Sequence, residues 1–455
     1  MDQMLEQKEL RRIRLVMFVV LLLTVLTQLI DNAFTLITPI LVERFQISTD
    51  MASWVASLGG VGIAIGFLAF SSFTDFISEK KLLIIGLLLF CLPSITGLLF
   101  QNYYFAVVAS RFVQAIGGIS TSALYLVLIA RYLPEKEQVI WMGLCTASFT
   151  VSTVIGTLTG GFLSSAFGWQ VIFYIPFIGL LALPIIIKYL PSATKESNTI
   201  DVLGFVLLSL FIIAINFLTS QPTLTLLIAS ILLLVLFLIY IAKAKNPLIS
   251  LVFFKNKSYM ITLLATFFYY LSQVALVFVT PFLLQSVFNF SLEDTSLIYI
   301  LPYTVSGVIA AFSGNIINKI GMKKALVLGA ILIMGGFVFG ACLAPNGIPY
   351  VLASLTLITG GYALSFAPFL TKAISSLEEK EVGTGIGFFN FIVRTANALG
   401  ISLTAFLLNL KLPEILPVIT GNSEMHLYSY IFIFLAFMTF IGIVVYLILT
   451  KNEKE

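Results

Sequence analysis

Long apolar stretches separated by short polar and charged segments make up the chain from about residue 15 to residue 450. A helix needs roughly 20 mainly apolar residues to cross the hydrocarbon core of a membrane. Fourteen stretches meet this length, at about 15–41, 51–74, 81–100, 103–131, 139–165, 169–190, 201–219, 223–243, 258–288, 295–317, 323–343, 348–375, 383–409 and 428–450. The pattern therefore predicts an all-α integral membrane protein with fourteen transmembrane helices.

The composition agrees with this class and excludes others. Hydrophobic residues make up 59% of the chain and charged residues only 10%, a balance unlike that of soluble domains. The single histidine, His426, lies in a predicted loop, and Cys91, Cys145 and Cys342 stand alone in apolar helices. These residues cannot supply a metal-ligand cluster or a Cys/His or Ser/His/Asp set. We expect no enzymatic activity, no metal site and no cofactor, and the net charge of +4 gives no reason to expect nucleic acid.

The basic residues predict the orientation, because positively charged loops stay on the cytoplasmic side. With the amino terminus inside, all but four of the 25 Lys and Arg fall in cytoplasmic segments. Arg44 and Lys411 fall outside, and Arg111 and Arg394 lie within helices. The first apolar run is too long for a cleaved signal peptide. We expect a multi-pass protein of the cell membrane, in a bacterium, with both termini in the cytoplasm.

Two loops of the chain repeat each other. The segment SSFTDFISEKKLLIIG at 71–86 superposes without a gap on GNIINKIGMKKALVLG at 314–329, so 243 residues separate the copies. The same offset carries the glycine pair at 117–118 onto the pair at 360–361. Two motifs in one register indicate an internal duplication.

The position of the repeat predicts the domain organisation. The first copy lies between the second and third helices and the second copy between the tenth and eleventh, so the repeat spans eight helices where two six-helix halves end to end would give six. The seventh and eighth helices are then an insertion. We expect a six-helix bundle over 1–195, two inserted helices over 196–246 and a second six-helix bundle over 247–455.

Two of four informative motifs are SRFVQAIGG at 110–118 and GTLTGGFLSSAFGWQVIFYIP at 156–176. They resemble the fourth-helix signature and the fifth-helix antiporter signature of the major facilitator superfamily, specifically its 14-helix drug:proton antiporter branch. RTANALG at 394–400 resembles the thirteenth helix of multidrug members. The loop at 71–81 resembles the loop signature, although both of its glycines and its arginine are replaced. The resemblance implies the major facilitator fold and transport by alternating access.

The resemblance also implies gates. An inner gate of charge pairs would involve Asp75, Lys80, Lys81 and Arg131, and a solvated loop is the alternative interpretation. Tight packing of the fifth helix through small residues would seal the outer side at Gly156, Gly160 and Gly161, and this is compatible with ordinary helix packing.

Asp31 is the only one of the 21 acidic residues that lies deep in a predicted span. A charge at mid-bilayer costs on the order of 3 kcal/mol or more unless it is paired, hydrated or neutralised. Its helix face carries polar residues at three- and four-residue spacing: Thr24, Thr27, Gln28, Asp31, Thr35 and Thr38. This face should lie on other helices or water, not on lipid.

Two arginines are candidate partners for this acid. At 1.5 Å per residue, Asp31 lies about 15 Å from the outer end of its helix and Arg111 about 12 Å from the outer end of the fourth helix, so they can meet. Arg394 lies nearer mid-depth and is the other candidate. We predict that these three residues couple transport to protons, with the acid moving between a guanidinium and a drier site. A fixed ion pair is the alternative.

The substrate wall should be apolar and aromatic with a few polar groups. The candidates are Gln28, Thr35, Tyr125, Tyr269, Tyr270, Gln273, Tyr303, Asn390 and Asn397, with Tyr299, Phe366, Phe388 and Phe389 as further aromatic candidates. Aromatic residues make up 13% of the chain, so core packing is the alternative for each ring.

The function predicted from these features is proton-coupled export of amphipathic, cationic drugs by a monomer in the lipid bilayer. Tetracycline–metal export is the nearest alternative, because the fourth-helix segment also resembles that of tetracycline exporters. Those exporters carry an acid on the thirteenth helix where this chain has Asn397, which weighs against it. Flipping of a lipid or glycolipid is a third possibility.

Overall fold

The computed structural model describes residues 2–74, 76–191, 201–244, 255–377, 382–410 and 425–449. Every regular element in these ranges is a helix. In this part of the chain, 14 helical segments are long and apolar enough to cross a membrane. The prediction of an all-α protein with fourteen spans is confirmed.

We call the elements before the insertion the N half. They are α1 (Asp2–Leu36), α2 (Thr38–Phe45), α3 (Thr49–Ala52), α4 (Trp54–Phe73), α5 (Glu79–Leu99), α6 (Tyr104–Gly118), α7 (Ser120–Tyr132), α8 (Glu135–Leu158), the π-helical turn η1 (Thr159–Leu163), α9 (Ser164–Phe167), the 3₁₀ helices η2 (Trp169–Phe173) and η3 (Ile175–Ala182), and α10 (Leu183–Tyr189).

We call α11 (Val202–Ser220) and α12 (Leu224–Lys243) the inserted pair, after the insertion that the loop repeat predicts. The elements after it form the C half: α14 (Lys257–Phe288), α15 (Leu292–Ile298), α16 (Ile300–Ile320), α17 (Met322–Leu343), η4 (Ala344–Asn346), α18 (Ile348–Ile374), α19 (Val382–Leu408) and α21 (Met425–Leu449).

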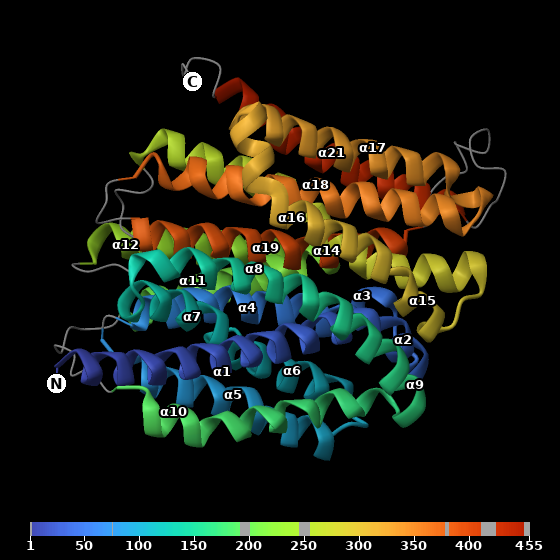
Figure 1. The fold of residues 1–455 in the computed structure, drawn as a ribbon. Coiled ribbons are helices and arrows are strands. Elements are labelled where there is room, and N and C mark those ends of the chain that lie inside the picture. The colour runs from blue at the N-terminus through green and yellow to red at the C-terminus, as the bar shows by residue number, and fades with distance from the viewer. Residues whose placement is uncertain are drawn as a thin grey trace.

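The start of α1 and the end of α21 lie at one end of the molecule (Figure 1). The short helices α2, α3, α9 and α15 lie at the opposite end, which we call the distal end. The N half and the C half meet where α4 packs along α19 and where α8 packs against α16. Helix α11 lies against both α4 and α19, so the inserted pair covers one edge of this seam.

The first predicted span is broken into two helices at Ile37. Pro39 has no N–H to donate to the carbonyl of Thr35, four residues earlier. The hydroxyl of Thr38 donates to that carbonyl instead, at 3.0 Å. The break therefore leaves no unpaired acceptor at Thr35.

The two halves repeat one close helix approach. A methyl group on Gly86 of α5 would lie 3.2 Å from the carbonyl oxygen of Gly117 on α6. A methyl group on Gly329 of α17 would lie 2.9 Å from the carbonyl oxygen of Gly361 on α18. Gly117 is thus structurally equivalent to Gly361. The loop repeat predicted Gly360, one residue earlier. Small residues let two helix backbones approach closely. This packing matters in a membrane because no hydrophobic driving force holds helices together in lipid.

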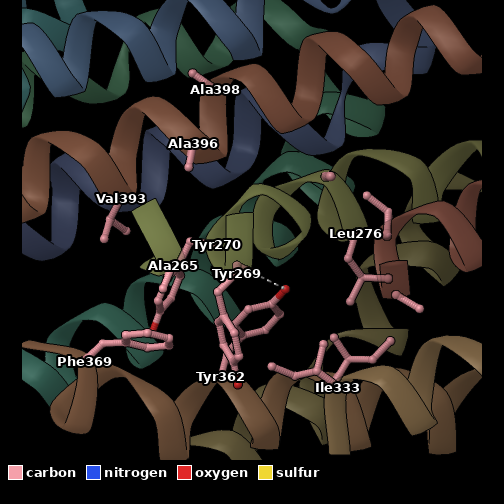
Figure 2. Packing of buried hydrophobic residues seen from close by; sticks show 14 of the residues in the cluster. Ala265, Tyr269, Tyr270, Leu276, Ile333, Tyr362, Phe369, Val393, Ala396 and Ala398 are labelled. Carbon is pink, nitrogen blue, oxygen red and sulfur yellow. Dashed lines mark hydrogen bonds between the residues drawn. The ribbon is translucent and has the colours of Figure 1, made fainter. Parts of the chain in front are cut away.

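An aromatic cluster fills the core of the C half (Figure 2). The ring of Tyr269 lies 4.9 Å from that of Phe369 and 5.8 Å from that of Tyr362, centroid to centroid, in edge-on geometry. The hydroxyl of Tyr362 lies 2.6 Å from the hydroxyl of Ser272. Buried hydroxyls need such partners because an unpaired polar group in an apolar core is costly.

Candidate functional site

Asp31 on α1 and Arg111 on α6 form an ion pair. The side chain of Arg111 is 2% exposed, whereas that of Asp31 is 19% exposed. The guanidinium is therefore enclosed by protein, and the carboxylate remains partly accessible. Of the two candidate partners for the acid, the structure pairs it with Arg111.

Arg111 is held on several sides. Its Nη1 donates to Oε1 of Gln114 at 3.1 Å, and Nε2 of Gln114 donates to the hydroxyl of Ser94 on α5 at 2.8 Å. The guanidinium carbon lies 4.9 Å from the centroid of the Phe34 ring. On the α4 side, a methyl group on Gly59 would lie 3.3 Å from the Nε atom of Arg111, so glycine leaves room for the side chain. The cation is fixed in place, and the carboxylate is the freer member of the pair.

The polar face of α1 is buried against other helices rather than lipid. Thr27 lies 3.2 Å, hydroxyl to hydroxyl, from Thr121 on α7. Thr35 is buried and donates to the backbone carbonyl of Asp31 at 3.0 Å. Nε2 of Gln28 is buried without a hydrogen-bond partner among the described residues. A buried amide without a hydrogen-bond partner is exceptional in a folded protein, and this one lies one helical turn from the acid.

Arg394 reaches this region from the C half. It lies half-buried on α19, and its guanidinium carbon is 5.8 Å from the centroid of the Phe149 ring on α8. It forms no ion pair or hydrogen bond with the other residues that the structure describes. Its charge nevertheless lies within Coulombic reach of the Asp31 carboxylate.

Three of the tyrosines predicted to line the substrate path lie inside packed cores. Tyr125, Tyr269 and Tyr270 are each at most 1% exposed. The hydroxyl of Tyr125 donates to the carbonyl of Trp141 at 3.1 Å, and that of Tyr269 lies 2.6 Å from the hydroxyl of Ser365. In this conformation neighbouring side chains enclose these three rings.

The other predicted substrate residues of the C half are more accessible. Gln273, Tyr303 and Asn390 are half-buried. The amide of Asn397 donates to Oε1 of Gln273 at 3.5 Å, which links α19 to α14. Asn390, Arg394 and Asn397 follow four- and three-residue spacing and therefore share one face of α19.

At the end that carries the termini, Arg131 forms an ion pair with Glu79. Glu79 is fully buried at the start of α5 and was not among the predicted gate residues. Lys80 is half-buried and Lys81 is exposed. Asp75 lies outside the described residues. The sequence places Glu79 directly before the basic pair Lys80 and Lys81, but it does not show that the glutamate side chain is buried.

The glycines of the fifth span lie at two different contacts. Methyl groups on Gly156 and Gly160 would meet the α1 backbone, at 2.5 Å from the carbonyl oxygen of Leu29 and 3.1 Å from that of Ala33. A methyl group on Gly161 would meet the C half, at 3.0 Å from the carbonyl oxygen of Leu292. The last glycine thus lies in the contact between the halves at the distal end.

Side-chain hydrogen bonds also join the halves at the distal end. Nδ2 of Asn409 on the C half donates to Asp50 at 2.9 Å, and Nε2 of Gln221 from the inserted pair donates to the same carboxylate at 2.8 Å. Nε2 of Gln285 donates to Glu43 at 2.8 Å. The distal end is therefore closed in this conformation.

Asn216 on α11 is a buried bridge that the sequence reasoning missed. It is 0% exposed, and its Oδ1 accepts from the hydroxyl of Ser57 on α4 at 3.2 Å. Its Nδ2 donates to the carbonyl of Ala398 on α19 at 3.5 Å. The sequence feature that could have identified Asn216 is that it is the one amide side chain in a mainly apolar inserted helix.

Comparisons with known proteins agree with this architecture. The family model of the Major Facilitator Superfamily matches residues 20–401 and 262–455. The chain is 24% identical over 368 residues to the multidrug resistance protein Stp of Mycobacterium tuberculosis, covering 77% of this chain and 68% of that protein. It is 23% identical over 400 residues to the riboflavin transporter RibZ of Clostridioides difficile, covering 86% and 87%. Its fold is similar to the crystal structure of the POT family transporter PepTSo, with a TM-score of 0.68 at 14% identity over 95% and 98% of the two chains.

Proposed function

This chain belongs to the Major Facilitator Superfamily, and from that premise we propose that it is a proton-coupled antiporter that exports amphipathic drugs by alternating access. It is a multi-pass membrane transporter and not an enzyme. The similarity to a protein named for multidrug resistance supports drugs as the substrates. The distribution of basic residues supports cytoplasmic termini, which makes the distal end extracellular.

The Asp31–Arg111 ion pair carries the proposal. Protonation of the carboxylate cancels one charge of the pair, and Arg111 keeps its hydrogen bond to Gln114. Deprotonation restores the attraction. A carboxylate that is partly accessible beside a fixed cation can therefore exchange a proton without dismantling its surroundings. Each proton that enters the cell yields about 2.3 kcal/mol per 100 mV.

Amphipathic cations are the first substrate class, because a positive group can replace the proton at Asp31. Tetracycline–metal chelates are the alternative, and flipping of a lipid or glycolipid is a third candidate. Riboflavin enters as a competitor in the assay, because RibZ is named as a riboflavin transporter.

The test is dye transport into inverted vesicles with an imposed proton gradient, in the wild type and in Asp31→Asn. The amide has the same shape but cannot release a proton, so gradient-driven transport should fall at least tenfold while dye exchange without a gradient continues. Asp294→Asn is the matched control, because that acid is exposed and bonds within its own helix cap. Full gradient-driven transport in Asp31→Asn would refute proton coupling through this residue. Tetracycline and riboflavin as competitors rank the substrate classes.

A further inference from the structure

The deep charges of the described spans do not balance. Asp31, Arg111 and Arg394 lie well inside their helices, and together they carry one net positive charge when the acid is ionised. Protonation of the acid raises this to two. An uncompensated charge in a membrane interior is expensive, so an arginine without an anionic partner among the described residues is a place for a negative group that is supplied from outside the chain.

Arg394 is the unbalanced charge. Arg111 has both Asp31 and Gln114 as hydrogen-bond partners, whereas the guanidinium of Arg394 forms no hydrogen bond or ion pair with the described residues and lies over the Phe149 ring. A ring that lies against the face of a guanidinium leaves the N–H donors at its edge free. Those donors match a carboxylate in a two-bond geometry.

The location of Arg394 suits a substrate group. The residue belongs to the C half, and it reaches across the seam to Phe149 of the N half. It shares a face of α19 with Asn390 and Asn397, whose amides add further polar groups. Its charge lies within Coulombic reach of Asp31. One molecule can therefore meet an acid from one half and a cation from the other.

We propose that Arg394 is a binding site for an ionised acidic group, such as a carboxylate or enolate, on the transported amphiphile. The preferred substrates are then zwitterions, with the positive group at Asp31 and the negative group at Arg394. This inference rests on the proposed export function and narrows its substrate class from simple cations to acid-bearing amphiphiles.

The proposal is tested by binding to the purified full-length protein in lipid nanodiscs. The probes are a rhodamine with a free carboxylate and its methyl ester, which share one cationic ring system and differ only in the acidic group. A charge-assisted hydrogen bond is strong enough that the wild type should bind the free acid roughly 10- to 100-fold more tightly than the ester. Arg394→Gln should remove this preference.

Two further variants make the result specific. Arg394→Lys keeps the charge but loses the two-bond geometry, so its preference should lie between those of the wild type and Arg394→Gln. It also serves if Arg394→Gln elutes as an aggregate in size-exclusion chromatography. Arg12→Gln removes an exposed arginine near the start of α1 and should keep the full preference.

Equal or tighter binding of the ester by the wild type would overturn the proposal. So would an undiminished preference for the free acid in Arg394→Gln or in Arg394→Lys. The binding ratio is measured without a proton gradient, whereas proton coupling is judged from gradient-driven transport in Asp31→Asn. The two proposals can therefore fail independently.

Discussion

Removal of the Asp50 carboxylate should open the distal end. Asp50 accepts hydrogen bonds from Asn409 of the C half and from Gln221 of the inserted pair. If the halves separate at this end, the hydrogen bond from Asn409 to Asp50 must break. The hydrogen bond from Gln221 to Asp50 then no longer lies at a contact between the halves. Asp50→Ala removes both bonds, and Asp50→Asn leaves one amide oxygen to accept from two donors.

The contacts set the size of the effect. Hydrogen bonds to charged groups contribute about 1.5–3 kcal/mol when buried, but Asn409 is exposed and Asp50 only half-buried. We discount each bond to about 1 kcal/mol for solvent screening. Asp50→Ala then costs the closed state about 2 kcal/mol, which is roughly a 30-fold change in the closed-to-open ratio. Asp50→Asn should cost about half as much in free energy.

The assay measures the distance between spin labels on the distal ends of the two halves, in a background without the three native cysteines. The minor population with a long distal distance should increase in Asp50→Asn and increase further in Asp50→Ala. Asp294→Ala is the control, because it also removes an acid from the first turn of a short distal helix, but its hydrogen bonds stay within that helix cap. An unchanged distance distribution in Asp50→Ala, or an equal change in Asp294→Ala, would refute the reasoning.

Two other perturbations test the seam and the terminal end. Gly161→Ala places a methyl group 2.5 Å from the hydroxyl oxygen of Ser296. It should therefore destabilise the distal closure by about 1–3 kcal/mol and increase the distance between the same spin labels. Gly143→Ala is the control and should leave this distance unchanged, because a methyl group there meets nothing within 4 Å beyond the backbone of its own helix in the described chain. The hydrogen bond from Arg14 lowers the pKa of the Glu137 carboxyl. The stability that this pair adds, under about 1 kcal/mol at an exposed site, should be present at neutral pH and disappear as the pH falls below about 4.3 and through the lowered pKa. The difference in melting temperature between wild type and Glu137→Gln, followed across that pH range, measures the stability from this pair. A difference that persists in acid would contradict the assignment.

The spans could be predicted from sequence because length and apolarity decide whether a helix crosses a membrane. Local breaks were harder to locate. The break at Ile37 depends on Pro39 and on whether a nearby hydroxyl can take the vacated carbonyl, as Thr38 does. The span that starts at Trp169 begins as 3₁₀ helix rather than α-helix. The spacing of its hydrophobic residues does not change there, so the sequence pattern did not indicate it.

The rare charges of the site could be predicted, whereas its lining could not. A deep acid is exceptional in a membrane span, so Asp31 stood out, and depth along the helices made Arg111 a candidate partner. Tyr125 and Tyr269 have the same residue type as a lining residue would, and only the rotation of the helix places them in the core. Burial also distinguishes Glu79 from its exposed neighbour Lys81, and sequence does not encode it locally.

The hydrogen bonds of the distal seal are weak, which is consistent with the proposed coupling through a single deep acid. The bonds at Asp50 and the bond from Gln285 to Glu43 involve exposed or half-buried groups, so together they contribute about 3 kcal/mol at most. One proton that moves inward across about 150 mV releases roughly 3.5 kcal/mol. A seal of buried ion pairs, each costing about 3–5 kcal/mol to break, would exceed the work that one proton can supply. If transport is coupled through Asp31 as proposed, stronger pairs engineered at Asp50 should therefore stop the cycle in the closed state.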